Sequence, residues 1–364
     1  MLRVLLAALA FAPAAGGAAD YPFSYQRVQV ADGVHAFIEP FGHAIVSGNI
    51  VAIVGEDAVA IVDSGHHPRL TRRITAEIRA LTPKPVRYLV NTHWHNDHVS
   101  GNSVFAEAFP GVMIVAHSFT AAMLDKDIRA FQGPNCVPFL TKQSKPIREA
   151  LASGKAADGT PLTDARRKRF RQFADEADTG IVECGEFRYR GADLTFEDKI
   201  TLRLGKRDVD VLHVGRANTA GDVVAWVPDA KVIAAGDLVV HPFPFATQSF
   251  VSEWAAVMRK LEAMPWDALV PGHGPVMRDR KYLADVREVL EAVMTQARAA
   301  YKPGMTAADL KQQMDLKALR ARFADGPQAA MIGANFDYMV GDLAVGRAWQ
   351  ELTGKFEPEG LPPS

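Results

Sequence analysis

The sequence predicts an α/β fold made of two related halves. Each half contains short apolar or alternating segments, which are typical of strands, and an amphipathic helix. A loop that carries histidine or aspartate follows them in each half. Between the halves lies a stretch without strand pattern, residues 118–181, which we predict to be a helical insertion. We therefore predict one α/β domain over residues 20–278, interrupted by this insertion, and a helical C-terminal extension over residues 279–364.

The first 19 residues predict a secretory signal peptide. Arg3 precedes the apolar run 4–11, and small residues at positions 17–19 suit a cleavage site. The apolar run is too short to span a bilayer. We therefore expect an exported protein, periplasmic or secreted.

The first half begins with four predicted strands, separated by turn signals such as DG and GED. A helix over residues 68–82 follows, with Leu70, Ile74 and Ile78 on one face and Pro68 suited to its first turn. The predicted strands are YQRVQV (25–30), VHAFIEP (34–40), SGNIVAIVG (47–55), AVAIVDSG (58–65), VRYLVNTH (86–93) and VMIVAH (112–117), with a short helix at SVFAEAF (103–109).

The second half repeats this order. Its predicted strands are DLTFEDKITLRLG (193–205), RDVDVLHVG (207–215), GDVVAWVPDAKVIAAGDLVV (221–240) and ALVPGHG (268–274), with a helix at residues 252–264. The extension is predicted to be helical at 281–301, 306–314, 315–323 and 336–354, with Thr306 as a candidate N-cap.

Composition excludes two classes of partner. The chain has 41 Lys and Arg residues against 42 Asp and Glu residues, so it lacks the excess of positive charge that is typical of a nucleic-acid-binding protein. The basic segment 164–173 is typical of a solvated helix face. A mean hydropathy of -0.03 and the lack of a long uncharged run exclude a membrane span. We expect a small-molecule substrate as the partner. The sequence leaves the oligomeric state open. It also leaves open whether Cys136 and Cys184 form a disulfide, because it does not give the distance between their Cα atoms.

The segment NTHWHNDHVSGN, residues 91–102, concentrates metal-ligand side chains. In an extended segment His93, His95 and Asp97 project to one side, and a turn after Asp97 brings His98 to a neighbouring position. A structural zinc site usually includes thiolates, whereas a thiol-free His/Asp set suits a site that keeps a position open for water. Further candidates stand at strand ends beside glycine: Asp63, Asp237 and His273.

This order of residues, from about Ser47 to Pro275, resembles the metallo-β-lactamase superfamily, whose signature is a strand-end Asp, His-x-His-x-Asp-His, a later His, an Asp or Cys, and a last His. The resemblance implies a four-layer αββα sandwich and a zinc hydrolase. It implies a first zinc at His93 and His95, a second zinc at Asp97, His98 and His273, and Asp237 as the bridge between them. Asp63 would orient the motif loop by hydrogen bonds.

One position departs from the family pattern. Asn218 in GRANTAGDVVAW stands where the family carries its middle histidine, and an amide oxygen is a weaker zinc ligand than imidazole. Asn218 could be a poor ligand, could leave a one-metal enzyme, or another histidine could replace it. The candidates are His66, His67, His213 and His241, of which His241 is the strongest because it follows Asp237 closely and could also reach a substrate; His117 is predicted to be structural.

Such a site predicts attack of activated water on a carbonyl-type bond, in an ester, thioester, lactone or β-lactam. Asp97 would orient the nucleophile, and either a zinc-bound water or Asp97 would supply the proton to the leaving group. Two alternatives stay open. The first is an iron-dependent oxidation of sulfur compounds, known within the same superfamily, and the second is a non-catalytic protein that handles a metal or cofactor. The insertion is either a lid over the site or a surface elaboration.

Overall fold

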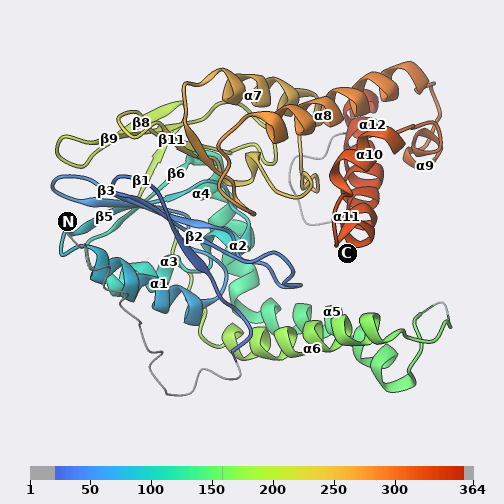
Figure 1. The fold of residues 1–364 in the computed structure, drawn as a ribbon, viewed down its shortest axis with the longest axis horizontal. Helices are drawn as coiled ribbons and strands as arrows, with labels where there is room; N and C mark the ends of the chain where they lie inside the picture. The colour runs from blue at the N-terminus through green and yellow to red at the C-terminus, as the bar shows by residue number, and fades with distance from the viewer. Residues whose placement is uncertain (1–20, 158, 356–364) are drawn as a thin grey trace, which may run out of the picture.

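The computed structural model describes residues 21–157 and 159–355. The predicted signal peptide, residues 1–19, lies outside the described residues. The described chain forms two β-sheets with helices on both outer faces (Figure 1).

The first sheet contains seven strands in the order β1-β2-β3-β4-β5-β6-β7. Strands β1 to β4 pair antiparallel, and β4 to β7 pair parallel. Helices α1 (Pro68–Leu81) and α3 (Asn102–Ala108) cover its outer face, where Ile74, Ile78 and Phe105 belong to one apolar core. The strands are β1 (Gln26–Ala31), β2 (Val34–Ile38), β3 (Ile50–Val54), β4 (Val59–Val62), β5 (Val86–Asn91), β6 (Met113–His117) and β7 (Leu194–Phe196).

The second sheet contains five strands in the order β12-β11-β10-β9-β8. Helices α7 (Val251–Ala263) and α8 (Lys281–Ala300) cover its outer face, with Trp254 and Leu290 fully buried beneath them. The strands are β8 (Lys199–Arg203), β9 (Asp208–Leu212), β10 (Val224–Val227), β11 (Val232–Ala234) and β12 (Ala268–Val270).

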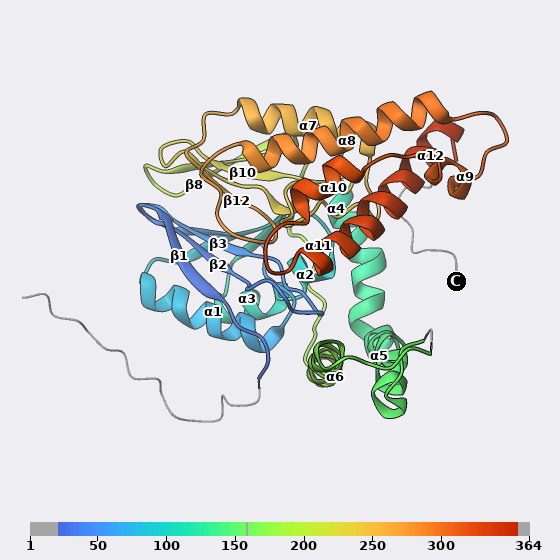
Figure 2. The ribbon, with the colours of Figure 1, turned by 45° about the vertical axis from the view of Figure 1, so that its right-hand side comes forward.

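The two sheets pack face to face, with α1 and α3 on one outside and α7 and α8 on the other (Figures 1 and 2). Alternate residues of both sheets, Val51, Ile53, Val209 and Val211 among them, form the core between them. This arrangement confirms the predicted four-layer αββα sandwich.

The predicted strands 193–205 and 221–240 are both wrong as single elements. The segment 221–240 contains β10 and β11, which pair antiparallel with each other. Residues 194–196 pair parallel with β6 in the first sheet, and residues 199–203 pair antiparallel with β9 in the second. The exposed Glu197 and Asp198 lie between them, where the chain crosses from one sheet to the other. The alternation of apolar residues on both sides of this polar pair hid the break.

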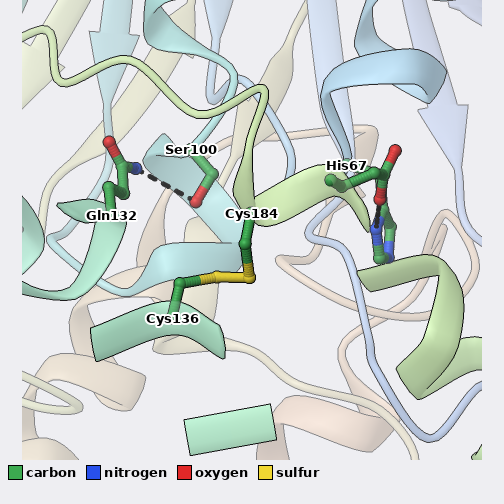
Figure 3. The surroundings of a disulfide bond; sticks show 6 residues. His67, Ser100, Gln132, Cys136 and Cys184 are labelled. Atoms are coloured by element: carbon green, nitrogen blue, oxygen red, sulfur yellow. Dashed lines mark hydrogen bonds and ion pairs between the residues drawn. A yellow bond between two sulfur atoms is a disulfide. The ribbon is translucent and has the colours of Figure 1, made fainter. Parts of the chain in front are cut away.

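The insertion is helical, as predicted, and it ends in a long hairpin of α5 (Cys136–Ser153) and α6 (Asp164–Cys184) that projects from the sandwich (Figure 1). Helix α6 runs to Cys184, beyond the predicted end at residue 181. Cys136 and Cys184 form a disulfide with a Cα–Cα distance of 5.8 Å, which joins the start of α5 to the end of α6 (Figure 3). Before the hairpin come α4 (Ser118–Met123), η1 (Leu124–Ile128) and η2 (Phe131–Asn135).

Helix α8, the first helix of the predicted extension, belongs to the outer helical layer of the sandwich together with α7. The rest of the extension, from α9 on, packs against this layer (Figure 2). Thr306 caps α9 as predicted, in a reciprocal pair with Asp309. The predicted last helix is the end of a longer helical run of three segments, α11, η4 and α12. No helix of the described residues is both long and apolar enough to cross a membrane. The elements are α9 (Ala307–Lys311), α10 (Lys317–Phe323), α11 (Ala329–Phe336), η4 (Asp337–Ala344) and α12 (Val345–Thr353).

Candidate metal centre

Four strand ends bring the predicted ligands to one edge of the sandwich. Asp63 follows β4, the segment 93–98 follows β5, and β4 and β5 are parallel neighbours. Asp237 lies in the turn η3 (Gly236–Leu238) after β11, His273 follows β12, and these strands are also parallel neighbours. Because parallel strands end at the same edge of a sheet, side chains distant in sequence meet there.

The first group of side chains comprises His93, His95 and Asp237, whose potential ligand atoms all lie within 4.8 Å of one another. His93 Nε2 is 3.6 Å from Asp237 Oδ2. The Nδ1 atom of His93 contacts Thr92 Oγ1 at 2.9 Å, which leaves Nε2 directed at the group.

The second group comprises Asp97, His98 and His273, with the same limit of 4.8 Å between ligand atoms. Asp97 Oδ2 lies 3.0 Å from His273 Nε2 and 3.5 Å from His98 Nε2. Asp97 lies in the first turn of the short helix α2 (Asn96–Val99), the turn that sequence reasoning required to bring His98 round.

Asp237 lies between the two groups. Its Oδ2 faces His93, whereas its Oδ1 is 3.1 Å from His98 Nε2 and 3.5 Å from His273 Nε2. The carboxylate therefore presents one oxygen to each group, which is the geometry that a bridging ligand requires.

Asp63 holds the loop that follows β5 in place by hydrogen bonds to Thr92 and His98. Its buried carboxylate accepts hydrogen bonds from Thr92 N and Thr92 Oγ1, both at 2.8 Å, and contacts His98 Nδ1 at 2.7 Å. With Nδ1 bonded to a carboxylate, His98 directs Nε2 toward Asp97 and Asp237. Asp63 itself has φ +60°, a left-handed backbone conformation that is uncommon outside glycine.

Two glycines permit the close approach of backbone to the ligands. A Cβ on Gly48, in the loop after β2, would lie 2.4 Å from the His98 ring. A Cβ on Gly272 would lie 2.0 Å from Asp237 Oδ1. Any side chain at either position would displace a predicted ligand.

The donor set fits a divalent cation. His93 Nε2 and both amide atoms of Asn218 are buried and lack a hydrogen-bond partner among the described residues. Buried polar atoms of this kind are costly without a partner, and an ion satisfies imidazole nitrogen and carboxylate oxygen together. Nitrogen and oxygen donors without thiolate suit zinc and other divalent metals of an open site.

A family model described as the metallo-beta-lactamase superfamily matches residues 44–273 of this chain. The chain belongs to the metallo-beta-lactamase superfamily.

Curated relatives and a solved structure agree with this membership. A linear primary-alkylsulfatase of Pseudomonas sp. (strain ATCC 19151) is 24% identical over 278 residues, which are 72% of this chain and 49% of the relative. A metallo-beta-lactamase type 2 of Elizabethkingia meningoseptica is 19% identical over 63% of this chain and 69% of its own length. The solved metallo-beta-lactamase from Pontibacter korlensis shares the fold, with a TM-score of 0.51 at 18% identity, covering 74% of this chain and 99% of that chain.

The match to the alkylsulfatase therefore spans about half of that protein. The superfamily to which the chain belongs includes metal-dependent hydrolases.

Asn218, which the sequence pattern aligns with the superfamily's middle histidine, is fully buried. Backbone hydrogen bonds hold the segment around it: Ala217 O accepts from Phe250 N at 2.7 Å, and Val223 N donates to Thr92 O at 2.9 Å. The segment that carries Asn218 is therefore bonded both to Thr92, next to His93, and to Phe250, which precedes α7.

The replacement histidines considered above do not join either group of ligand atoms in the described residues. His241 N donates to His273 O at 3.1 Å, but its ring lies against Tyr282. His213 Nδ1 contacts the Asp222 carbonyl at 2.8 Å, and His67 Nδ1 contacts Glu183 Oε2 at 2.8 Å. His117 accepts from Phe119 N at the start of α4, so its structural role is confirmed. His66 is buried near Asp97, and burial lowers its pKa to about 4.

Sequence reasoning missed two polar residues beside the centre. Gln248 Oε1 lies 3.1 Å from His95 Nε2. Glu39 is buried after β2, where its Oε2 accepts from Ser47 N at 2.8 Å, and burial raises its pKa to about 7. Neither residue stands in a motif or in a periodic pattern, so only the fold reveals them.

Protons and metal compete for the second group. Burial disfavours the charged form of His98, but the carboxylates of Asp237, Asp97 and Asp63 outweigh it and raise the pKa of His98 well above 6.5. The pKa of His273 is also raised, because Asp237 and Asp97 outweigh its burial. The first group differs, since burial lowers the pKa of both His93 and His95.

A metal that binds the second group must therefore displace protons, and we expect its affinity to rise with pH. Because the pKa values of His98 and His273 are raised above 6.5, the rise should continue beyond pH 6.5, by about tenfold per pH unit for each proton displaced. Zinc titration calorimetry at several pH values, in two buffers of different ionisation enthalpy, measures both the zinc affinity and the number of protons released. A zinc affinity that stays level from pH 6.5 to 8, without proton release, would contradict this assignment.

Proposed function

We propose that this protein is a hydrolase with two zinc ions, which cleaves an ester, thioester, lactone or β-lactam bond. The observation that carries the proposal is the position of Asp237, whose two carboxylate oxygens face two separate His/Asp groups. Bound zinc lowers the pKa of water to about 7 and polarises the bond under attack.

The chain's own residues supply orientation and proton handling. His93, His95 and Asp237 would hold the first ion, and Asp97, His98 and His273 the second, with Asp237 shared. Asp97 and His273 have partly exposed side chains, at 20% and 15%, and His95 is also partly buried, so these three ligands border the side from which a substrate approaches. We assign to Asp97 the orientation of the attacking water and transfer of its proton to the leaving group.

Export is part of this proposal. The predicted signal peptide directs the chain to the periplasm or the outside, and the Cys136–Cys184 disulfide suits an oxidising compartment of that kind.

The test is a panel of ester, thioester, lactone, β-lactam and sulfate-ester substrates, assayed with zinc, manganese and iron. The sulfate ester is included because of the alkylsulfatase relative. We expect turnover of a carbonyl substrate with zinc and about two zinc ions per chain. Activity that requires one iron ion would favour sulfur oxidation, and an empty or single metal site without turnover would favour the non-catalytic alternative.

Asn218→His provides a separate prediction. Imidazole is a better zinc ligand than an amide, so the variant should bind zinc at the first group about tenfold more tightly or better. Competition with a chelator measures the change, and the affinity of the second group in the same variant is the internal control. Unchanged affinity at the first group would show that Asn218 does not face the metal.

A further inference from the structure

The C-terminal extension reaches the loop that carries Gln248. Arg347 on α12 is buried, with 8% of its surface exposed. Its Nη2 donates to the Gln248 carbonyl at 3.0 Å, and its Nε donates to the Ser249 carbonyl at 3.0 Å. One turn later on the same helix, Glu351 Oε1 accepts from Ser252 N in the first turn of α7. Helix α12 thus fixes the backbone of residues 248–252 from the outside.

Gln248 in turn contacts the first group. Its Oε1 is 3.1 Å from His95 Nε2 and also accepts from Thr247 Oγ1. An amide oxygen can only accept, so this contact is a hydrogen bond when His95 carries its proton on Nε2. In that tautomer Nδ1 has a free lone pair, which a metal ion can take.

We propose that Arg347 is a positioning residue of the metal centre, which acts through Gln248 to set the tautomer and the ring orientation of His95. This inference rests on the proposed metal centre and assigns a role in it to the C-terminal extension. The chain of contacts runs from α12 through Arg347, the carbonyl of Gln248 and its side chain to His95.

The chemistry of arginine suits this role. The planar guanidinium presents donors in a fixed fork, and here it bonds two successive carbonyls while Nη1 donates to Gln350 Oε1 at 2.8 Å. Lysine would supply a charge but not the fork. Without these donors, two buried carbonyls lose a partner and the loop that holds Gln248 can shift.

The test compares zinc binding in Arg347→Met, Gln248→Leu and the double variant, by chelator competition. His95→Ala and His273→Ala assign the two binding steps to the first and second groups. We expect each single variant to weaken zinc at the first group by about 10- to 100-fold, with the second group within about twofold of wild type. The double variant should lose no more than Gln248→Leu alone, because Arg347 acts through Gln248. Arg347→Lys should recover part of the loss.

Arg322→Met is the matched control, since Arg322 lies on α10 of the same extension with 47% of its side chain exposed and pairs with Glu288 and Asp285. It should leave both zinc affinities unchanged. First-group affinity at the wild-type level in folded Arg347→Met or Gln248→Leu would overturn the inference. So would an equal loss at both groups or a fully additive double variant, because a general structural role predicts those results. If Arg347→Met does not fold, Gln248→Leu still tests the step at His95. Wild-type protein without zinc at either group would instead overturn the proposed function.

Discussion

Asp97→Ala is expected to lower turnover by about 10²- to 10⁴-fold, the usual contribution of a positioned acid or base, with a further loss from the weakened metal site. Asp97 Oδ2 lies 3.0 Å from His273 Nε2 and 3.5 Å from His98 Nε2, so the change removes one oxygen ligand and the proposed proton carrier together. His95→Ala should have a comparable effect through the first group. The measurement is kcat/KM on the best substrate of the panel, with zinc content determined on the same samples.

The fold should survive both changes, because the aspartate and the histidine lie on a loop at the edge of the sandwich. Circular dichroism and thermal unfolding check this. Asp198→Ala, at the exposed crossing between the sheets, is the control and should retain wild-type rates. Near-normal turnover in Asp97→Ala or His95→Ala would refute the hydrolase mechanism.

Removal of the disulfide is expected to have the largest effect on stability. Cys136 and Cys184 are 48 residues apart, and closing a loop of that length restricts the unfolded chain by about 4 kcal/mol in the chain-entropy account. We expect the double variant Cys136→Ala/Cys184→Ala to lose about 2–4 kcal/mol of unfolding free energy. Urea denaturation followed by circular dichroism measures the loss.

Wild-type protein unfolded with a reductant present should show the same loss as the double variant, which separates the bond from the substitutions. Other contacts join the insertion to the sandwich: His67 contacts Glu183 on α6, and Gln132 Nε2 on η2, just before the hairpin, donates to Ser100 Oγ at 3.2 Å (Figure 3). If these contacts alone hold the hairpin, the urea midpoint will not change, and the stabilising role of the disulfide is refuted.

The sequence predicts most of the sandwich because its strands and helices follow simple periods. The spacing of apolar residues in the helix at 68–81 indicates which face of the helix is buried. The continuous apolar runs of β3 to β5 likewise indicate buried strands. The break between β7 and β8 escaped prediction, since a strand that changes sheets keeps its alternation on both sides. The disulfide also escaped it, because the 5.8 Å between the two Cα atoms results from how α5 and α6 pack.

At the candidate centre too, residues with a local sequence pattern were predictable, whereas residues brought together only by packing were not. His93, His95, Asp97 and His98 are adjacent in sequence, and Asp63, Asp237 and His273 each follow a strand beside glycine, so their meeting was predictable. Gln248 and Arg347 are 99 residues apart and carry no such pattern. Their contact depends on the docking of α12 against the α7 layer, which no local feature of the sequence specifies.

The central claim is that two divalent ions lie between these strand ends. Anomalous diffraction from crystals of the zinc-loaded protein, collected on both sides of the zinc edge, tests it most directly. The account predicts two peaks per chain, about 2.0–2.2 Å from their ligand atoms, one at His93 and His95 and the other at Asp97, His98 and His273, with Asp237 in contact with both. A map with no peak among these six side chains, or with zinc bound elsewhere, would contradict the account.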